Sequence, residues 1–129
     1  TTLMVDFKGQ CASEAIRNVQ ISGTGGQVET AIGAQMAKGG KSIITLHSTA
    51  DIKKPGSDET IRVSKIVPFF DKGTIITLAR TDVEYVVTEY GIACLKGSSI
   101  KDRTKMLINI AHPDFRVELT EEAKKNDFI

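Results

Sequence analysis

The sequence contains no tryptophan, only 5% aromatic residues and only two histidines. It also carries almost no net charge, because 17 lysines and arginines stand against 16 aspartates and glutamates, a balance of +1. Binding of single-stranded nucleic acid uses a basic groove and aromatic side chains on which bases stack, and attachment to an anionic membrane uses excess positive charge. The chain as a whole lacks these signatures, so an anionic ligand could be held only by a local cluster of charge.

The chain has only two cysteines, Cys11 and Cys94, and neither belongs to a C-x-x-C or Cys/His pattern. A structural metal site needs several nitrogen or sulfur ligands at close spacing, so the sequence predicts no metal centre. No apolar run is long enough for a signal peptide or a transmembrane helix. We therefore expect a protein of the reducing cytoplasm, whose thiols pack rather than bind.

Length and composition favour one domain. A chain of 129 residues with 40% hydrophobic and 26% charged residues suits a single core. The sequence shows no internal repeat and no low-complexity tract, so we expect residues 1–129 to form a single domain. The first residue is Thr1 and not Met, as in a processed product or a piece of a longer chain.

A glycine-rich stretch at 22–27, Ser-Gly-Thr-Gly-Gly-Gln, stands directly before a predicted helix. Gly23, Gly25 and Gly26 allow positive φ and let another molecule approach the backbone amides closely. We expect Gly25 or Gly26 to have a positive φ. The first amides of a helix lack internal partners and lie at the positive end of its dipole, so the stretch predicts a cradle for an oxyanion or a phosphate. A tight connection between a strand and a helix explains the three glycines equally well.

Hydrophobic periodicity predicts an alternation of strands and helices along the chain. We expect strands at 2–7, 19–22, 42–46, 61–67, 74–78 and 83–89, a helical turn or loop at 13–17, and helices at 28–36, 102–111 and 113–125. Ser98 or Ser99 is the expected cap of the second helix, and Pro113 fits the first turn of the third. The 42–46 and 74–78 strands are predicted to be buried, and the 61–67 strand to return antiparallel to 42–46, with 51–60 as a hairpin tip. This order predicts an α/β fold with a mixed open sheet and flanking helices.

Three titratable side chains lie where sites often form. Glu89 ends a predicted strand before Gly91, where an enzyme can expose a nucleophile, but we favour a partnered structural carboxylate. His47 follows a predicted strand, where ligands collect in α/β proteins, and is otherwise a loop histidine. His112 lies between two predicted helices, where capping is commoner than catalysis, because no Ser or Cys in a nucleophile elbow accompanies it.

Six stretches follow one another in an order that goes beyond a generic α/β pattern. They are Val-Asp-Phe-Lys-Gly-Gln at 5–10, Ser-Gly-Thr-Gly-Gly-Gln-Val at 22–28, Ala-Lys-Gly-Gly-Lys-Ser-Ile-Ile at 37–44, Ser-Lys-Ile-Val-Pro at 64–68, Val-Val-Thr-Glu-Tyr-Gly-Ile-Ala at 86–93 and Ile-Ala-His-Pro-Asp-Phe-Arg at 110–116. Taken together they resemble the C-terminal domain of the acetyl-CoA hydrolase/transferase family, which includes 4-hydroxybutyrate and butyrate CoA-transferases. The resemblance implies a CoA-transferase-like domain from the C-terminal half of a longer enzyme.

The resemblance also implies an acyl-CoA:carboxylate CoA-transferase of the acetate, butyrate or 4-hydroxybutyrate type. In the family a glutamate attacks the thioester, giving an acyl-glutamyl anhydride and then a glutamyl-CoA thioester. That glutamate lies before this domain and matches no residue of this chain, so we expect the chain alone to be inactive. The chain would supply the glycine stretch, in which the amide of Gly25 or Gly26 holds the thioester oxyanion. The implied partners are acyl-CoA, a short-chain carboxylate, the N-terminal domain of the same enzyme and a homo-oligomer.

Gly23, Gln27, Lys38 and His47 are the further residues expected to bind substrate or coenzyme A. Lys38 is expected to contact the phosphates of coenzyme A, although a cation that caps the helix is the simpler role. The lysines around the predicted hairpin are disfavoured for this contact, because the hairpin reads as an insertion that a shared cofactor would not depend on.

The sequence departs from the family pattern at several positions. Glu29 and Thr30 replace the usual Asp-Phe, His47 replaces Pro, Cys94 replaces Asp, and the 51–60 segment is longer than expected. These departures affect the substrate more than the reaction class. An acetyl-CoA hydrolase of the same family and a noncatalytic CoA-binding or interaction domain remain open alternatives. The length of the native reading frame would distinguish the enzyme, which needs a preceding domain, from a free-standing binding module.

Overall fold

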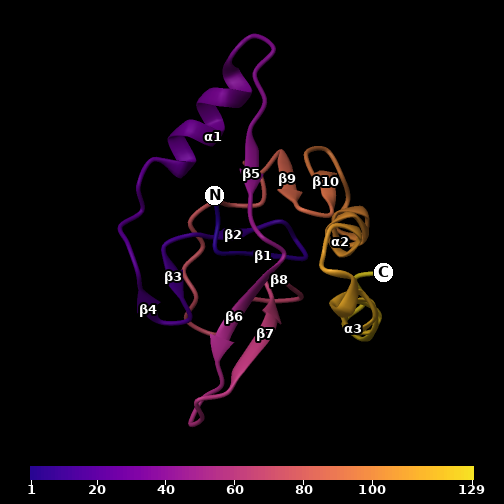
Figure 1. Cartoon of the computed structure of the whole chain (residues 1–129). Coiled ribbons are helices and arrows are strands. Elements are labelled where there is room, and N and C mark those ends of the chain that lie inside the picture. The colour runs from indigo at the N-terminus through magenta and orange to yellow at the C-terminus, as the bar shows by residue number, and fades with distance from the viewer.

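A computed structural model describes all residues from 1 to 129 (Figure 1). Its elements in chain order are β1 (Met4–Asp6), β2 (Cys11–Ala12), β3 (Ala15–Ile16), β4 (Val19–Gln20), α1 (Gln27–Met36), β5 (Ile43–Thr45), β6 (Thr49–Lys53), β7 (Thr60–Ser64), β8 (Ile66–Val67), β9 (Tyr85–Thr88), β10 (Gly91–Cys94), α2 (Ile100–Asn109) and α3 (Pro113–Lys125). The three predicted helices are therefore present. None of them is long and apolar enough to span a membrane.

The strands form a mixed arrangement, as predicted, but they are divided among four small sheets. Two sheets have three strands each, in the orders β2-β1-β8 and β10-β9-β5, and β3-β4 and β6-β7 are two-stranded hairpins. β1 pairs with β8 and β5 pairs with β9 in parallel, whereas the remaining pairs are antiparallel. The α/β class is thus confirmed, with several short sheets where one open sheet was expected.

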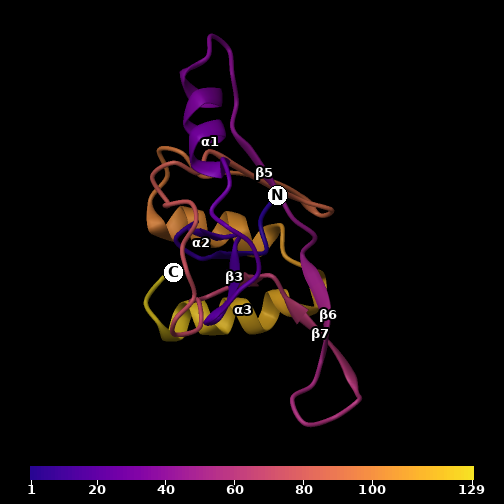
Figure 2. The same ribbon diagram turned by 90° about the vertical axis from the view of Figure 1, so that its left-hand side faces the viewer.

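The expected pairing of 61–67 with the 42–46 strand is wrong. β7 instead pairs with β6 in a register that runs from Thr49 opposite Ser64 to Lys53 opposite Thr60. At Ser64 the hydroxyl donates to the carbonyl oxygen of Ile66 at 2.7 Å and accepts from its amide at 3.2 Å. This local turn divides the predicted strand, so that β8 is free to pair with β1. The β6-β7 hairpin projects from the body of the molecule (Figure 2).

Other local predictions also need correction. Residues 13–17 contain the short strand β3 where a helical turn or loop was expected, and the strand β10, which begins at Gly91, was not predicted. Residues 74–78 form no strand beyond an isolated bridge between Leu78 and Cys11, because the exposed Ile75 and Ile76 have no strand to pair with. β5 is also not buried on both faces, since only the middle residue of Ile43–Thr45 is buried.

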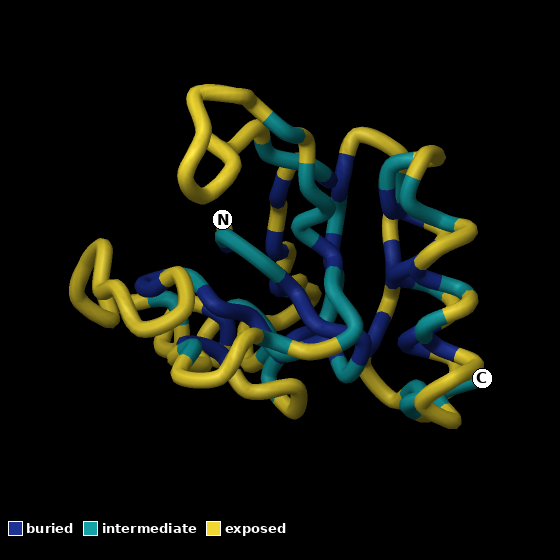
Figure 3. Tube along the Cα trace, turned by 90° about the horizontal axis from the view of Figure 1, so that it is seen from below, coloured by how far each residue is buried: buried dark blue, intermediate teal, exposed yellow.

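The core lies where the two three-stranded sheets meet α2 and α3 (Figure 3). Leu107 and Ile108 of α2, with Leu119 and Ala123 of α3, belong to one cluster of 18 buried residues. Ser99 caps α2 as predicted, because its hydroxyl accepts from the Asp102 amide at 3.1 Å. α1 contributes only Ala31 to this cluster and extends from the body of the molecule (Figure 1).

Candidate functional site

The glycine stretch leads into the N-terminus of α1. Gly25 has φ of +60°, as predicted for one of the two glycines, whereas Gly26 has φ of −105° and serves as N-cap without any side-chain hydrogen bond. The amides of Gly25, Gly26 and Gln27 donate to no acceptor within the chain. Gly23, Gly25 and Gly26 are all exposed, and no atom stands within 4 Å of where a Cβ would lie. A row of free amides therefore faces solvent at the positive end of a helix dipole.

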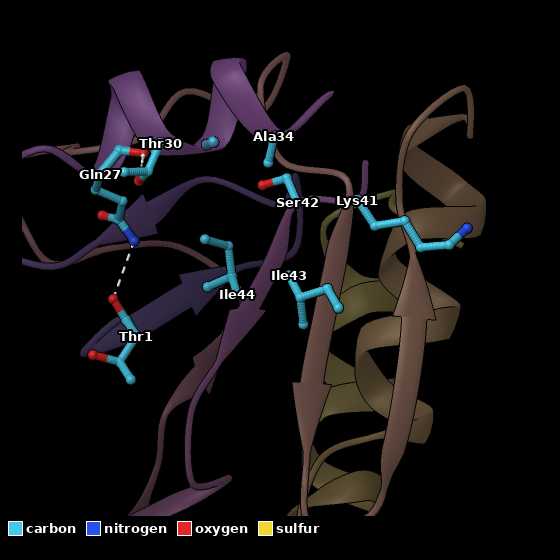
Figure 4. A pocket seen from close by; sticks show the side chains of 9 residues that line it. Thr1, Gln27, Thr30, Ala34, Lys41, Ser42, Ile43 and Ile44 are labelled. Atoms are coloured by element: carbon cyan, nitrogen blue, oxygen red, sulfur yellow. Dashed lines mark hydrogen bonds between the residues drawn. The ribbon is translucent and has the colours of Figure 1, made fainter. Parts of the chain in front are cut away.

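A cavity of about 370 Å³ begins beside this N-terminus and lies between α1 and β5 (Figure 4). Its lining consists of Thr1, Gln27, Thr30, Ala31, Ala34, Lys41, Ser42, Ile43 and Ile44. The Gln27 side chain donates through Nε2 to the Thr1 carbonyl oxygen at 3.1 Å, and its buried Oε1 has no hydrogen-bond partner. Gln27 lines the cavity but the three glycines do not, so the free amides of Gly25 and Gly26 lie at its side.

Glu89 directly follows β9, and its carboxylate is held by Ser48, the residue after His47. The Ser48 hydroxyl donates to Glu89 Oε1 at 2.6 Å, and the Ser48 amide donates to Oε2 at 2.9 Å. The two residues meet because β5 and β9 are parallel neighbours and their carboxyl ends lie at the same edge of the sheet. The carboxylate is therefore partnered, which supports the structural role that we favour.

The pKa of Glu89 is lower than that of an ordinary glutamate. Partial desolvation acts to raise this pKa, but hydrogen bonds from the Ser48 hydroxyl and from the backbone, together with the charge of His47, outweigh it. Lys65 lies in the same region, and its amide donates to the Ser48 carbonyl oxygen at 2.8 Å. Desolvation lowers the pKa of Lys65, and the negative charge of Glu89 partly opposes this change. The cluster thus holds Glu89 in its ionised form.

The two histidines differ in their surroundings. His47 is exposed beside Glu89. His112 caps α3, because its Nδ1 accepts from the Asp114 amide at 3.3 Å, and its ring contacts Tyr90 edge-on at a centroid distance of 5.3 Å. The predicted capping role of His112 is confirmed.

The structure does not bring all the predicted site residues together. Gly23, Gly25, Gly26 and Gln27 gather at the N-terminus of α1, whereas His47 and Glu89 meet at the ends of β5 and β9. Lys38 is exposed beyond the other end of α1, a helix of 10 residues and therefore about 15 Å long. Lys41 is the lysine that lines the cavity, and its ammonium lies 5.6 Å from the centroid of the Tyr85 ring.

Sequence reasoning missed two residues that organise this part of the fold. Ser48 fixes Glu89, and only its place just after a predicted strand pointed to it. Arg103 is buried and donates to the carbonyl oxygens of Lys8 at 3.1 Å, Arg80 at 2.8 Å and Ser98 at 3.3 Å. Its position on α2 gave no signal, because a charged residue in a helix is normally read as solvent-facing.

Comparisons with known proteins agree with the resemblance inferred from the sequence. Residues 1–123 match the model of the acetyl-CoA hydrolase/transferase C-terminal domain. The chain is 50% identical over 123 residues to the 4-hydroxybutyrate coenzyme A transferase of Clostridium kluyveri. The matched residues make up 95% of this chain and 27% of that protein. It is 48% identical over 124 residues to the succinyl-CoA:cyclohexane-1-carboxylate CoA transferase of Geobacter metallireducens, with 96% and 26% covered.

A solved structure shows the same fold. The crystal structure of RipA from Yersinia pestis superposes with a TM-score of 0.82 and 43% identity, over 99% of this chain and 27% of that one. The chain thus spans about a quarter of the length of the proteins that it matches. The family-model match over nearly all residues settles the relationship: the chain belongs to the acetyl-CoA hydrolase/transferase family, as its C-terminal domain.

Proposed function

We propose that this chain is part of an acyl-CoA:carboxylate CoA-transferase and that its glycine stretch supplies an oxyanion site. The observation that carries the proposal is the exposed run of unpaired amides at Gly25, Gly26 and Gln27, opened by the positive φ of Gly25. When a carboxylate attacks a thioester, negative charge develops on the thioester oxygen. Amides fixed in advance at that position stabilise the charge, and the loss of one such donor typically lowers the rate by ~10²–10³.

The nucleophile in this proposal comes from outside the chain. The family resemblance implies a glutamate located before this domain, and Glu89 within the domain has both carboxylate oxygens engaged by Ser48. We therefore assign Glu89 to holding the strand ends together. We propose that acyl-CoA is contacted by Gly23, Gln27, Lys38 and His47. Assembly with a second copy of the enzyme stays a prediction.

A hydrolase of the same family is the second candidate. It differs only in whether water or a carboxylate resolves the enzyme-bound intermediate. The Clostridium kluyveri and Geobacter metallireducens relatives both carry the name of a transferase, which favours transfer. A noncatalytic CoA-binding domain is the third, and the free amides of the glycine stretch would serve it as a phosphate cradle.

A chimeric enzyme tests the proposal. In the Clostridium kluyveri relative, this chain would replace the matched 123 residues, and transfer of CoA between acetyl-CoA and butyrate would be measured. We expect a folded chimera with transferase activity, and no activity from this chain alone. Gly25→Val should reduce kcat, because a branched side chain disfavours the positive φ that orients the neighbouring amides. A folded chimera that binds coenzyme A without turnover would favour the noncatalytic domain.

A further inference from the structure

One face of the β10-β9-β5 sheet is covered and the other is bare. Side chains alternate between the faces of a strand, and Ile44, Val86 and Ala93 point to the covered face, where they are buried in the core. α2 packs against this side of the sheet through β10. The residues between them point away from the core.

The bare face carries a row of large apolar side chains from all three strands. Ile43, Val87 and Ile92 lie there with the Tyr85 ring, around a depression of about 180 Å³. Pairing places Ile43 opposite Tyr85 and Ile92 opposite Val87, so the row is continuous across the sheet. Ile92 is 69% exposed and Ile43 is 56% exposed. Contiguous apolar surface of this kind usually marks a place where another protein packs.

The bare face continues into the cavity beside α1. Lys41 and Ile43 line both hollows, so the two adjoin at β5. The α1 side is the more polar one, and it contains the buried Gln27 Oε1 that has no hydrogen-bond partner. A buried acceptor of this kind normally finds a donor, so it indicates that a polar group from elsewhere completes this side.

We infer that the bare face, defined by Ile43, Tyr85, Val87 and Ile92, is the surface on which the preceding part of the enzyme packs. The occupant follows from size, because the matched relatives are nearly four times as long as this domain and the domain is the C-terminal one. The inference deepens the proposed function, since it names the face that joins the glycine stretch to the part that carries the nucleophile. The packed part of the enzyme would place apolar side chains against the sheet and a hydrogen-bond donor near Gln27 Oε1 beside α1.

The chain contains its own reporter for this surface. Cys94 lies two residues after Ile92 on β10 and therefore on the same face, and it is exposed, whereas Cys11 is buried. The rate of alkylation at Cys94 would be measured by peptide mass spectrometry in this chain and in the chimera that contains it. The reactivity of Cys11 reports folding, because the thiol stays unreactive while the core is intact.

We expect alkylation of Cys94 to be slower by about tenfold or more in the chimera, since a packed surface must open before the thiol reacts. Ile92→Asp should restore fast alkylation in the chimera, because it places a charge in the apolar contact. Val117→Asp is the matched control, since Val117 on α3 is 70% exposed, and it should leave Cys94 protected. Val117→Cys should react equally fast in both proteins.

Equal alkylation rates at Cys94 in the two proteins would overturn the inference. Protection that appears in the isolated chain as its concentration rises, without further protection in the chimera, would assign the face to a second copy instead. If the chimera loses protection at Cys11 and so is unfolded, the same cysteine placed at the matching position of the Clostridium kluyveri enzyme repeats the test. None of these measurements depends on activity, so the inference and the proposed function fail separately.

Discussion

α1 and α2 are both helices of 10 residues, yet they are held in the protein by different means. α2 buries Arg103, Thr104, Leu107 and Ile108 and begins at a serine cap. α1 buries only Ala31, has no side-chain cap, and leaves Val28, Ile32 and Met36 exposed. A helix this short is only marginally stable alone, so its packing decides its stability. The comparison indicates that buried packing and a cap hold α2, whereas α1 has little of either.

The contacts of α1 are largely polar and lie at its two ends. The Gln27 side chain donates to Thr1, and the Gln35 side chain donates to the Asp82 carbonyl oxygen at 2.8 Å and accepts from Lys96 at 2.6 Å. Hydrogen bonds exposed to water contribute little each. We therefore expect changes in α2 to affect the free energy of unfolding more than equivalent changes in α1.

Truncation of a buried leucine should give the largest effect. Leu107 is fully buried in the core, so Leu107→Ala is expected to lower the free energy of unfolding by about 2–5 kcal/mol through lost burial and the cavity left behind. Ile32→Ala on α1 removes a similar side chain that is already exposed, so it should change the free energy of unfolding by less than about 1 kcal/mol. Urea denaturation of both variants measures the difference. Equal losses would show that α1 is as well packed as α2.

Arg103 provides the second test of the packed side. Arg103→Met keeps much of the apolar length but leaves the carbonyl oxygens of Lys8, Arg80 and Ser98 without their donor. Unsatisfied buried acceptors typically lower stability by about 1–3 kcal/mol, and we expect a loss in this range. Lys101→Met is the control, because Lys101 is an exposed cation on the same helix. A loss no larger than that of the control would mean that water replaces the guanidinium freely.

The packed side is also the part that sequence reasoning describes best. The caps at Ser99 and His112, the proline at the start of α3 and the apolar spacing of both helices are local signals, and the structure confirms all of them. The errors fall on strands, because pairing is decided by distant partners. Residues 74–78 have the composition of a strand but pair only at Leu78, in a single bridge to Cys11. Residues 61–67 are divided by a side-chain hydrogen bond of Ser64 that no periodicity reveals.

The same difference between local signals and contacts of distant residues applies to the predicted site. The positive φ of one glycine follows from the local sequence, and the structure places it at Gly25. The bond between Ser48 and Glu89 joins residues 41 positions apart and depends on the parallel pairing of β5 with β9, which the sequence does not encode in a local pattern. The roles of Gly23, Gln27, Lys38 and His47 toward acyl-CoA stay predictions.

Two glycines near α1 make the comparison sharper. Gly33 lies in the middle of the helix with open space where a Cβ would be, so Gly33→Ala should stabilise α1 by about 0.5–1 kcal/mol. At Gly40 a Cβ would lie 2.0 Å from the Ala34 carbonyl oxygen, so Gly40→Ala should destabilise the helix end instead. Hydrogen exchange of the α1 amides measures both. Slower exchange in both variants would contradict the placement of the 37–40 turn.

The smallest expected effect concerns Glu89, an exposed residue directly after β9, the strand that pairs with β5. Because the folded pKa lies below the ordinary glutamate value of about 4.3, the ionised group stabilises the fold above that value. This contribution is lost as the pH falls through the folded pKa.

Ser48→Ala removes the hydroxyl donor, so the pKa of Glu89 should rise toward its ordinary value, as an NMR titration of the carboxyl carbon would measure. The stability difference between the native chain and Ser48→Ala should accordingly be present near pH 7 and shrink on acidification. In a Glu89→Gln background the same serine change should show no such pH dependence, because the titrating group is gone. A pKa that stays low in Ser48→Ala would assign the shift to the backbone amides and His47 instead of the hydroxyl.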